Sequence, residues 1–164
     1  MTTKKALRIY SLIFTTTLGI SACEAQQTKP GTRILPIKEL FSSLNCNINK
    51  ASITAITDKL SLQETLNKTK PYISNSTISE LASIDFNTSA VYLVAMGVKP
   101  NSGYSIKLTN VDARYEHGTL NLPLKVEQPL KGGMYAQMMT SPCILISLPS
   151  GAYNKVSIPN WKPE

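Results

Sequence analysis

Hydrophobic and polar residues alternate with the period of β-strands over much of the second half of the chain. The longest apolar run, Val91–Met96, has the length of a strand and no polar interruption, which predicts a central strand covered on both faces. Tyr104, Ile106 and Leu108 then alternate with polar residues, which predicts a half-buried strand paired to that run. The residues between them, Pro100–Gly103, favour a turn in which Gly103 adopts a positive φ.

Further strand signals are shorter. We expect a strand at Ala51–Ile56, alternating strands on either side of a turn at His117–Gly118, and a last strand at Tyr153–Ile158. The segment Met134–Leu148 contains two strand-like pieces, separated by Ser141–Pro142.

Two capping-box patterns predict short helices before the main strands. Ser61–Glu64 predicts a helix from Leu62 to Lys68 that ends at Pro71, and Thr77–Glu80 predicts another short turn through Ala82. Five or six strands without βαβ alternation indicate a mainly β fold, a small antiparallel β-sandwich or open barrel with one or two short helices near its N-terminal side.

The first 22 residues are typical of a secretory signal peptide. Lys4, Lys5 and Arg8 precede an apolar, threonine-rich run that is too short to span a bilayer stably. The run ends at Leu18–Cys23, which resembles a bacterial lipobox; the simpler reading is ordinary cleavage after Ala22. We therefore expect residues 23–34 to be a lipidated Cys23 and a flexible tether, and residues 35–164 to form one β domain.

Lipidation would anchor the protein in the cell envelope without spanning the membrane. Glu24 follows the lipidated cysteine, whereas an Asp at this position tends to mean inner-membrane retention. We therefore expect the protein to be anchored in the outer membrane, facing the periplasm or the surface, rather than in the inner membrane.

The formal charge of +7 does not indicate a nucleic-acid partner. Three of the 17 basic residues lie in the signal peptide, which leaves 14 basic against 10 acidic residues. The remaining lysines are scattered and are not interleaved with aromatic residues. A solvated basic surface is the expected reading.

Two cysteines, Cys46 and Cys143, remain in the exported domain. An even number of cysteines in an oxidising compartment favours a disulfide, and two separate buried thiols are the alternative.

The sequence contains no glycine-rich phosphate loop, CxxC pair, HExxH or GxSxG motif, so we expect no enzyme, cofactor or metal site. The single His117 is expected in a surface turn, and Asp85 at the entry of a strand, where it caps backbone amides. Met134, Met138 and Met139 are expected to fill the core or pack within a loop, and a partner surface is the alternative.

Two loops remain as candidate binding sites. Lys99, Pro100, Asn101, Ser102, Gly103 and Tyr104 form a turn between strong strands, where binding residues tend to lie. The alternative is that Tyr104 turns into the core. Gly132 and Gly133 mark a second, wide loop.

The chain contains three motifs in this order: Asp85–Phe86, Lys99–Tyr104 and Ser141–Pro142. Through these motifs the chain resembles the C-terminal domain of the PrcB family over roughly residues 53–158. The family consists of bacterial lipoproteins associated with a secreted or surface protease complex. The resemblance implies a non-catalytic accessory subunit that binds and stabilises an exported protease.

A fainter likeness leads to a different function. The Pro100–Tyr104 turn and the Gly132–Gly133 loop are similar to loops of chagasin-type cysteine-protease inhibitors, which are Ig-like sandwiches. The third inhibitor loop, an Arg-Pro-Trp-like motif, has no clear match. This resemblance implies inhibition of a protease in place of support.

Overall fold

The computed structural model describes residues 31–69 and 75–163. The signal peptide, the lipobox and Pro71 lie outside the described residues, so the predictions made for them stay predictions. In the described part the chain forms two helices and ten strands. The strands are β1 (Arg33–Pro36), β2 (Lys38–Ser43), β3 (Ala51–Ile56), β4 (Ser89–Met96), β5 (Ser105–Leu108), β6 (Asp112–Glu116), β7 (Thr119–Asn121), β8 (Leu124–Glu127), β9 (Cys143–Pro149) and β10 (Lys155–Ser157).

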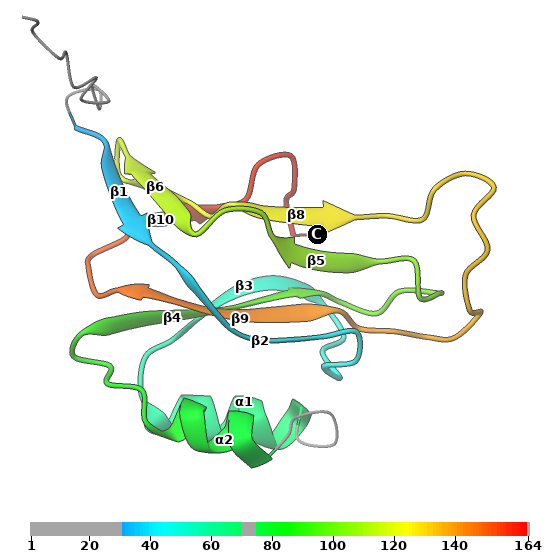
Figure 1. Cartoon of the computed structure of the whole chain (residues 1–164), viewed down its shortest axis with the longest axis horizontal. Coiled ribbons are helices and arrows are strands. Elements are labelled where there is room, and N and C mark those ends of the chain that lie inside the picture. Colours follow the sequence, from blue (N-terminus) through cyan, green and yellow to red (C-terminus); the bar gives the residue numbers. More distant parts are fainter. Residues whose placement is uncertain (1–30, 70–74, 164) are drawn as a thin grey trace, which may run out of the picture.

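The predicted mainly β fold and its sandwich arrangement are confirmed, with more and shorter strands than the sequence indicated. Figure 1 shows three layers: an upper layer of strands, a central sheet and a lower layer of two helices. The central sheet has the order β2-β9-β4-β3, and the upper layer consists of the sheet β1-β6-β7-β10 and the pair β5-β8. No closed barrel forms among these strands.

Strand β4 owes its central place to its apolar side chains. Tyr92, Val94 and Met96 lie in the core between the two β layers, while Val91 and Leu93 lie in a second core that includes residues of the helices. Since successive side chains of a strand point to opposite faces, an unbroken apolar run fits a strand buried on both sides. The prediction for this run is confirmed.

The helices are α1 (Lys59–Thr69) and α2 (Asn75–Ala82), and both begin earlier than predicted. The N-terminal cap of α1 is Asp58, because the Ser61 amide donates to Asp58 Oδ1 at 2.8 Å and the Asp58 amide donates to Ser61 Oγ at 3.2 Å. Ser61 is therefore the inner residue of the capping box, where we had placed it as the cap. These hydrogen bonds also lower the pKa of Asp58 below its usual value, the backbone bond from Ser61 most of all.

Two further expectations need correction. Residues 33 and 34, assigned to the tether, belong to β1 and pair with Tyr115 and Arg114 of β6. Of the two strand-like pieces in Met134–Leu148, only the second forms a strand, β9; Thr140 joins Lys99 in an isolated bridge.

Candidate functional site

The Lys99–Tyr104 loop connects the two β layers of the sandwich. It leaves β4 in the central sheet and enters β5, which pairs with β8 and not with β4 as we predicted. The apolar run of β4 already has β9 and β3 as neighbours, so no edge of it is free for β5. The loop is therefore a crossing between sheets, not a hairpin.

Gly103 has a different role from the one expected. Its φ is not positive; among the glycines near this loop, Gly97 has the positive φ, at 72°. A Cβ atom at Gly103 would lie 2.8 Å from the Tyr135 ring and 2.9 Å from Pro129. The position requires glycine because other side chains pack against its backbone.

Tyr104 is turned largely inward. Its half-buried ring packs against the core between the β layers. The Lys99 ammonium lies 5.6 Å from the centre of that ring, within the range of a cation–π contact. Pro100, by contrast, is exposed at the tip of the loop. Tyr104 is thus turned towards the core, as the alternative prediction had it, and Pro100 remains accessible.

Tyr135 joins the two predicted loops. A Cβ atom at Gly133 would lie 2.6 Å from the Tyr135 ring, and this is the same ring that packs against Gly103. The Tyr135 hydroxyl accepts a hydrogen bond of 2.9 Å from the Leu130 amide. The sequence analysis missed this residue, although an aromatic residue two positions after a glycine pair is a signal that could have found it.

Backbone hydrogen bonds hold the loops together. Lys99 and Thr140 exchange two bonds, of 2.7 and 2.9 Å, and Ser102 and Ala136 exchange two more, of 3.1 and 3.0 Å, one of them through the Ser102 hydroxyl. Four backbone amides, those of Lys99, Ser102, Ala136 and Thr140, thus find their acceptors across the two loops. The Lys99–Tyr104 loop and the Gly132–Gly133 loop are parts of one bonded structure.

A third loop, residues 44–50, is tied to the same end of the molecule. Cys46 forms a disulfide with Cys143, with the two Cα atoms 5.9 Å apart, which confirms the predicted bridge. Asn45 pairs with Ser141 in an isolated bridge, and the Ser141 amide donates to the Leu44 carbonyl at 2.9 Å. We call residues 44–50, 97–104 and 128–141 the loop end; Figure 1 shows it on the right, opposite β1.

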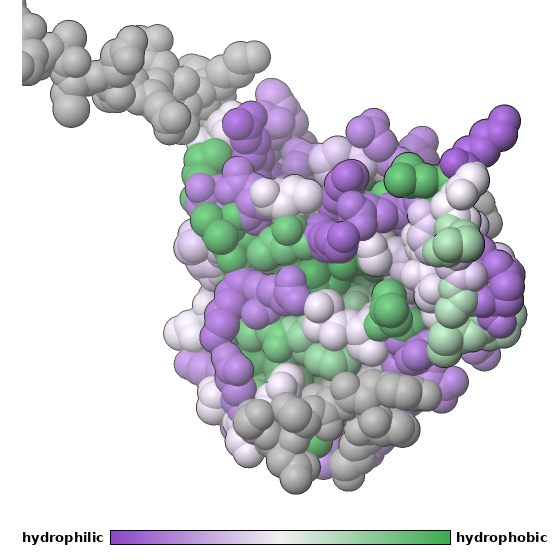
Figure 2. Space-filling model, turned by 45° about the vertical axis from the view of Figure 1, so that its right-hand side comes forward, coloured by the Kyte–Doolittle hydropathy of each residue, from purple (hydrophilic) through white to green (hydrophobic). Residues whose placement is uncertain are grey.

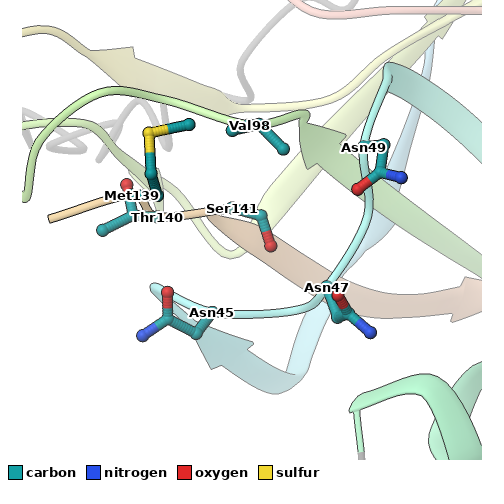
Figure 3. A pocket seen from close by; sticks show the side chains of 7 residues that line it. All are labelled: Asn45, Asn47, Asn49, Val98, Met139, Thr140 and Ser141. Atoms are coloured by element: carbon teal, nitrogen blue, oxygen red, sulfur yellow. The ribbon is translucent and has the colours of Figure 1, made fainter.

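Two hollows open at the loop end. A groove of about 640 Å³ runs along β5 and β8 and is lined by residues that include Ser102, Gly103, Leu130 and Tyr135. A pocket of about 210 Å³ lies beside the disulfide loop, and its lining is polar except for Val98 and Met139 (Figure 3). Neither hollow contains a pair of acids or a histidine, and both are open to solvent.

The ionised groups of the groove, two lysines and one glutamate, form a single cluster. Lys107 of β5 stands opposite Lys125 of β8, and Glu127 accepts hydrogen bonds from both, at 2.6 and 3.3 Å, and from Ser105 at 2.9 Å. The bond from Lys107 contributes most to lowering the pKa of Glu127 to about 2. This carboxylate links β5 to β8 through side-chain contacts and is a poor proton acceptor at neutral pH.

The remaining candidates are structural. His117 is exposed at the β6–β7 turn with a φ of 51°, as expected for a surface turn. Asp85 accepts the Asn87 amide at 2.9 Å through Oδ1, which confirms the capping role and is the main cause of its lowered pKa. Within residues 31–69 and 75–163, no three His, Cys, Asp or Glu side chains group as metal ligands would. No helix in these ranges has the length and apolar character needed to cross a membrane.

The methionine prediction is wrong. Met134 is 99% exposed, Met139 67% and Met138 49%. They lie on the part of the loop that forms no strand and is attached through Tyr135 and through backbone bonds, so their side chains are not needed for packing.

The family comparison concerns the segment that runs from β4 to β9. Residues 90–149 match the family model of the PrcB C-terminal domain. The match confirms the resemblance over these residues, a shorter range than the one we expected. The PrcB C-terminal segment contains the Lys99–Tyr104 loop, the Gly132–Gly133 loop and Tyr135, and it leaves out the helices, β1 to β3 and β10. No curated protein and no solved structure matches the chain.

Proposed function

We propose that this protein is a lipid-anchored, non-catalytic subunit that binds and stabilises an exported protease in the cell envelope. The observation that carries the proposal is the match to the PrcB C-terminal domain, whose residues 90–149 include both candidate loops. The family is associated with a protease complex, and the two loops contain exposed residues of the matched segment that lie outside its strands.

The position of the loop end supports this role. The described chain begins at the opposite end of the molecule, where β1 enters the upper layer (Figure 1). An acyl anchor on Cys23, as the lipobox predicts, would tether the domain from that side. The loop end is then free to face a partner in the periplasm or at the surface.

An inhibitor is the second candidate. The joining of the Lys99–Tyr104 and Gly132–Gly133 loops by Tyr135 favours it, since chagasin-type inhibitors use loops of these two kinds. The two candidates differ in the sign of the effect on the protease: an accessory subunit raises its abundance or activity, and an inhibitor lowers its activity.

The test is crosslinking in the native envelope, with a C-terminal tag on the full-length protein and identification of the peptidase that copurifies. Pro100→Ala should reduce its recovery, because Pro100 is exposed at the tip of the loop. Pro36→Ala, at a proline in β1 that is also exposed but lies outside the loop end, is the matched control. Tyr104→Ala needs a parallel check of folding, because its ring packs on the core.

Deletion of the protein then decides between the candidates. A peptidase that loses abundance or activity supports the accessory subunit, and one that gains activity supports the inhibitor. If no peptidase depends on the protein, both proposals are wrong.

A further inference from the structure

Exposed hydrophobic side chains gather at the loop end. Of the nine large hydrophobic residues that are exposed in the described part of the chain, six lie there: Leu44, Val98, Leu130, Met134, Met138 and Met139. Figure 2 turns this end towards the viewer and shows hydrophobic residues in green among hydrophilic ones in purple. Concentration of exposed apolar residues in one region is typical of an interaction surface.

Three of the six are methionines on one loop, Met134, Met138 and Met139. An unbranched, polarizable side chain adapts to irregular apolar surfaces, and for this reason methionine is common at protein-binding sites. Leu130, at the start of the same loop, is 76% exposed. We call residues 130–139 the methionine loop.

The methionine loop is fixed at its base although its tip is exposed. Tyr135 holds the Leu130 amide, and the Gly133 amide donates to the Leu130 carbonyl at 3.0 Å. Ala136 is bonded to Ser102 in both directions. A loop that is already ordered loses less conformational entropy on binding than a free one, so its exposed side chains can contribute more of their burial to affinity.

The charge of the loop end has one sign. Residues 44–50, 97–104 and 128–141 contain three lysines, Lys50, Lys99 and Lys131, and no aspartate or glutamate. Lys131 is exposed within the methionine loop itself. A complementary partner therefore carries carboxylates around an apolar surface.

We propose that the methionine loop is the anchor of the docking surface and that its partner is an exported protein with an apolar pocket bordered by carboxylates. This inference rests on the proposed function and deepens it, because it assigns the main contact to Met134 and Met139 and gives Tyr135 the task of holding the loop base. An anionic membrane is the other surface that lysine and methionine could contact. The position of the loop end opposite β1 favours a protein over the membrane in which the chain is anchored.

Site-specific photocrosslinking in intact cells tests the inference. A photoreactive amino acid replaces one residue at a time in the full-length protein: Met134 and Met139 in the methionine loop, and Leu60 and Val111 as controls. Leu60 and Val111 are 79% and 66% exposed and lie outside the loop end, so they match the methionines in accessibility. We expect one protein adduct at both methionine positions and none of that protein at the controls.

Substitutions test the chemistry of the contact. Met134→Gln with Met139→Gln keeps the side-chain length on exposed positions, so the fold is retained, and should reduce recovery of the crosslinked protein about tenfold or more. Leu60→Gln should leave recovery unchanged. Lys131→Glu should reduce recovery further, and raising the ionic strength should weaken the wild-type complex.

The outcomes separate the two proposals. An adduct confined to positions 134 and 139, mapped to an apolar surface with neighbouring carboxylates, supports the methionine loop whatever the partner is. If that partner is not a peptidase and no peptidase depends on the protein, the proposed function fails and the docking surface stands. Adducts with lipid, or equal protein adducts at positions 60 and 111, overturn the inference.

Discussion

Breaking the Cys46–Cys143 disulfide should lower the free energy of unfolding by at most about 4.7 kcal/mol at 25 °C, by the chain-entropy model. The bridge joins the 44–50 loop to the first residue of β9, and both cysteines are buried, with 0% and 1% of their surface exposed. It therefore fastens the early part of the domain to a strand that lies next to β4 in the central sheet.

The magnitude follows from the length of chain that the bridge closes. The cysteines are 97 residues apart in sequence. In the chain-entropy model the unfolded chain loses about 2.1 + 1.5R ln n cal/mol/K on crosslinking, which for a loop of this length corresponds to about 4.7 kcal/mol at 25 °C. Residual structure in the unfolded chain reduces this value, so the model figure is an upper bound.

The assay is urea unfolding of the oxidised and the reduced protein, followed by the fluorescence of Trp161, the single tryptophan, which packs against the core. Reduction keeps both sulfur atoms and so isolates the crosslink, whereas Cys46→Ala with Cys143→Ala also leaves a cavity. The m-value should rise on reduction, because the unfolded chain becomes more expanded. A loss of less than about 1 kcal/mol on reduction would refute the entropic reasoning.

Three further perturbations test the packing and the electrostatics. Gly97→Ala should cost about 1–3 kcal/mol of unfolding free energy in urea, because its φ is 72° and a Cβ would lie 2.8 Å from the Ala51 amide nitrogen. Gly118→Ala should cost less, because Gly118 has a similar φ of 76° but its Cβ would lie 3.8 Å from the nearest atom, Asn154 Nδ2. Glu127→Gln should lower the Tm at neutral pH, because the lowered pKa of Glu127 means that its ionised form stabilises the fold. This stabilisation is lost on protonation, so the difference in Tm from wild type should shrink as the pH falls from about 4.5 to about 2. A difference in Tm that does not depend on pH would contradict this. Tyr135→Phe should accelerate hydrogen exchange of the Leu130 amide and leave the Tm nearly unchanged, and unchanged exchange would show that the 2.9 Å bond does not hold the loop.

The sequence identified the parts of the fold in which a single local signal decides the outcome. The unbroken apolar run of β4 predicts burial on both faces, and that is where β4 lies. The even number of cysteines in the domain that we expect to be exported favoured the bridge that the structure contains. In each case the signal has one low-energy solution, since apolar surface must be covered and paired thiols in an oxidising compartment are oxidised.

The errors arose where tertiary pairing decides. The alternation of Tyr104–Leu108 predicts a strand but does not determine which strand pairs with it. In the structure β5 pairs with β8 and not with β4. The sequence also predicted fewer and longer strands than the structure has. Strands as short as β7 and β10 contain too few residues to show an alternating pattern.

The sequence marked the two candidate loops but not the residue that joins them. Both predicted loops lie at the loop end, yet the residue that joins them, Tyr135, lies outside both. The methionines were expected inside because apolar side chains usually are, and only the path of the loop shows that they are exposed. Exposure of a residue in a segment without regular structure depends on contacts that the sequence does not reveal.

The most direct measurement of the central claim is the amount of exported peptidase in envelopes from three strains: one that expresses the wild-type protein, one that lacks it, and one that expresses the Met134→Gln, Met139→Gln variant at equal level. The account predicts that one peptidase is depleted in the strain without the protein and depleted to a similar degree with the variant, whereas Leu60→Gln restores it. Equal levels of every envelope peptidase in the three strains would contradict the account.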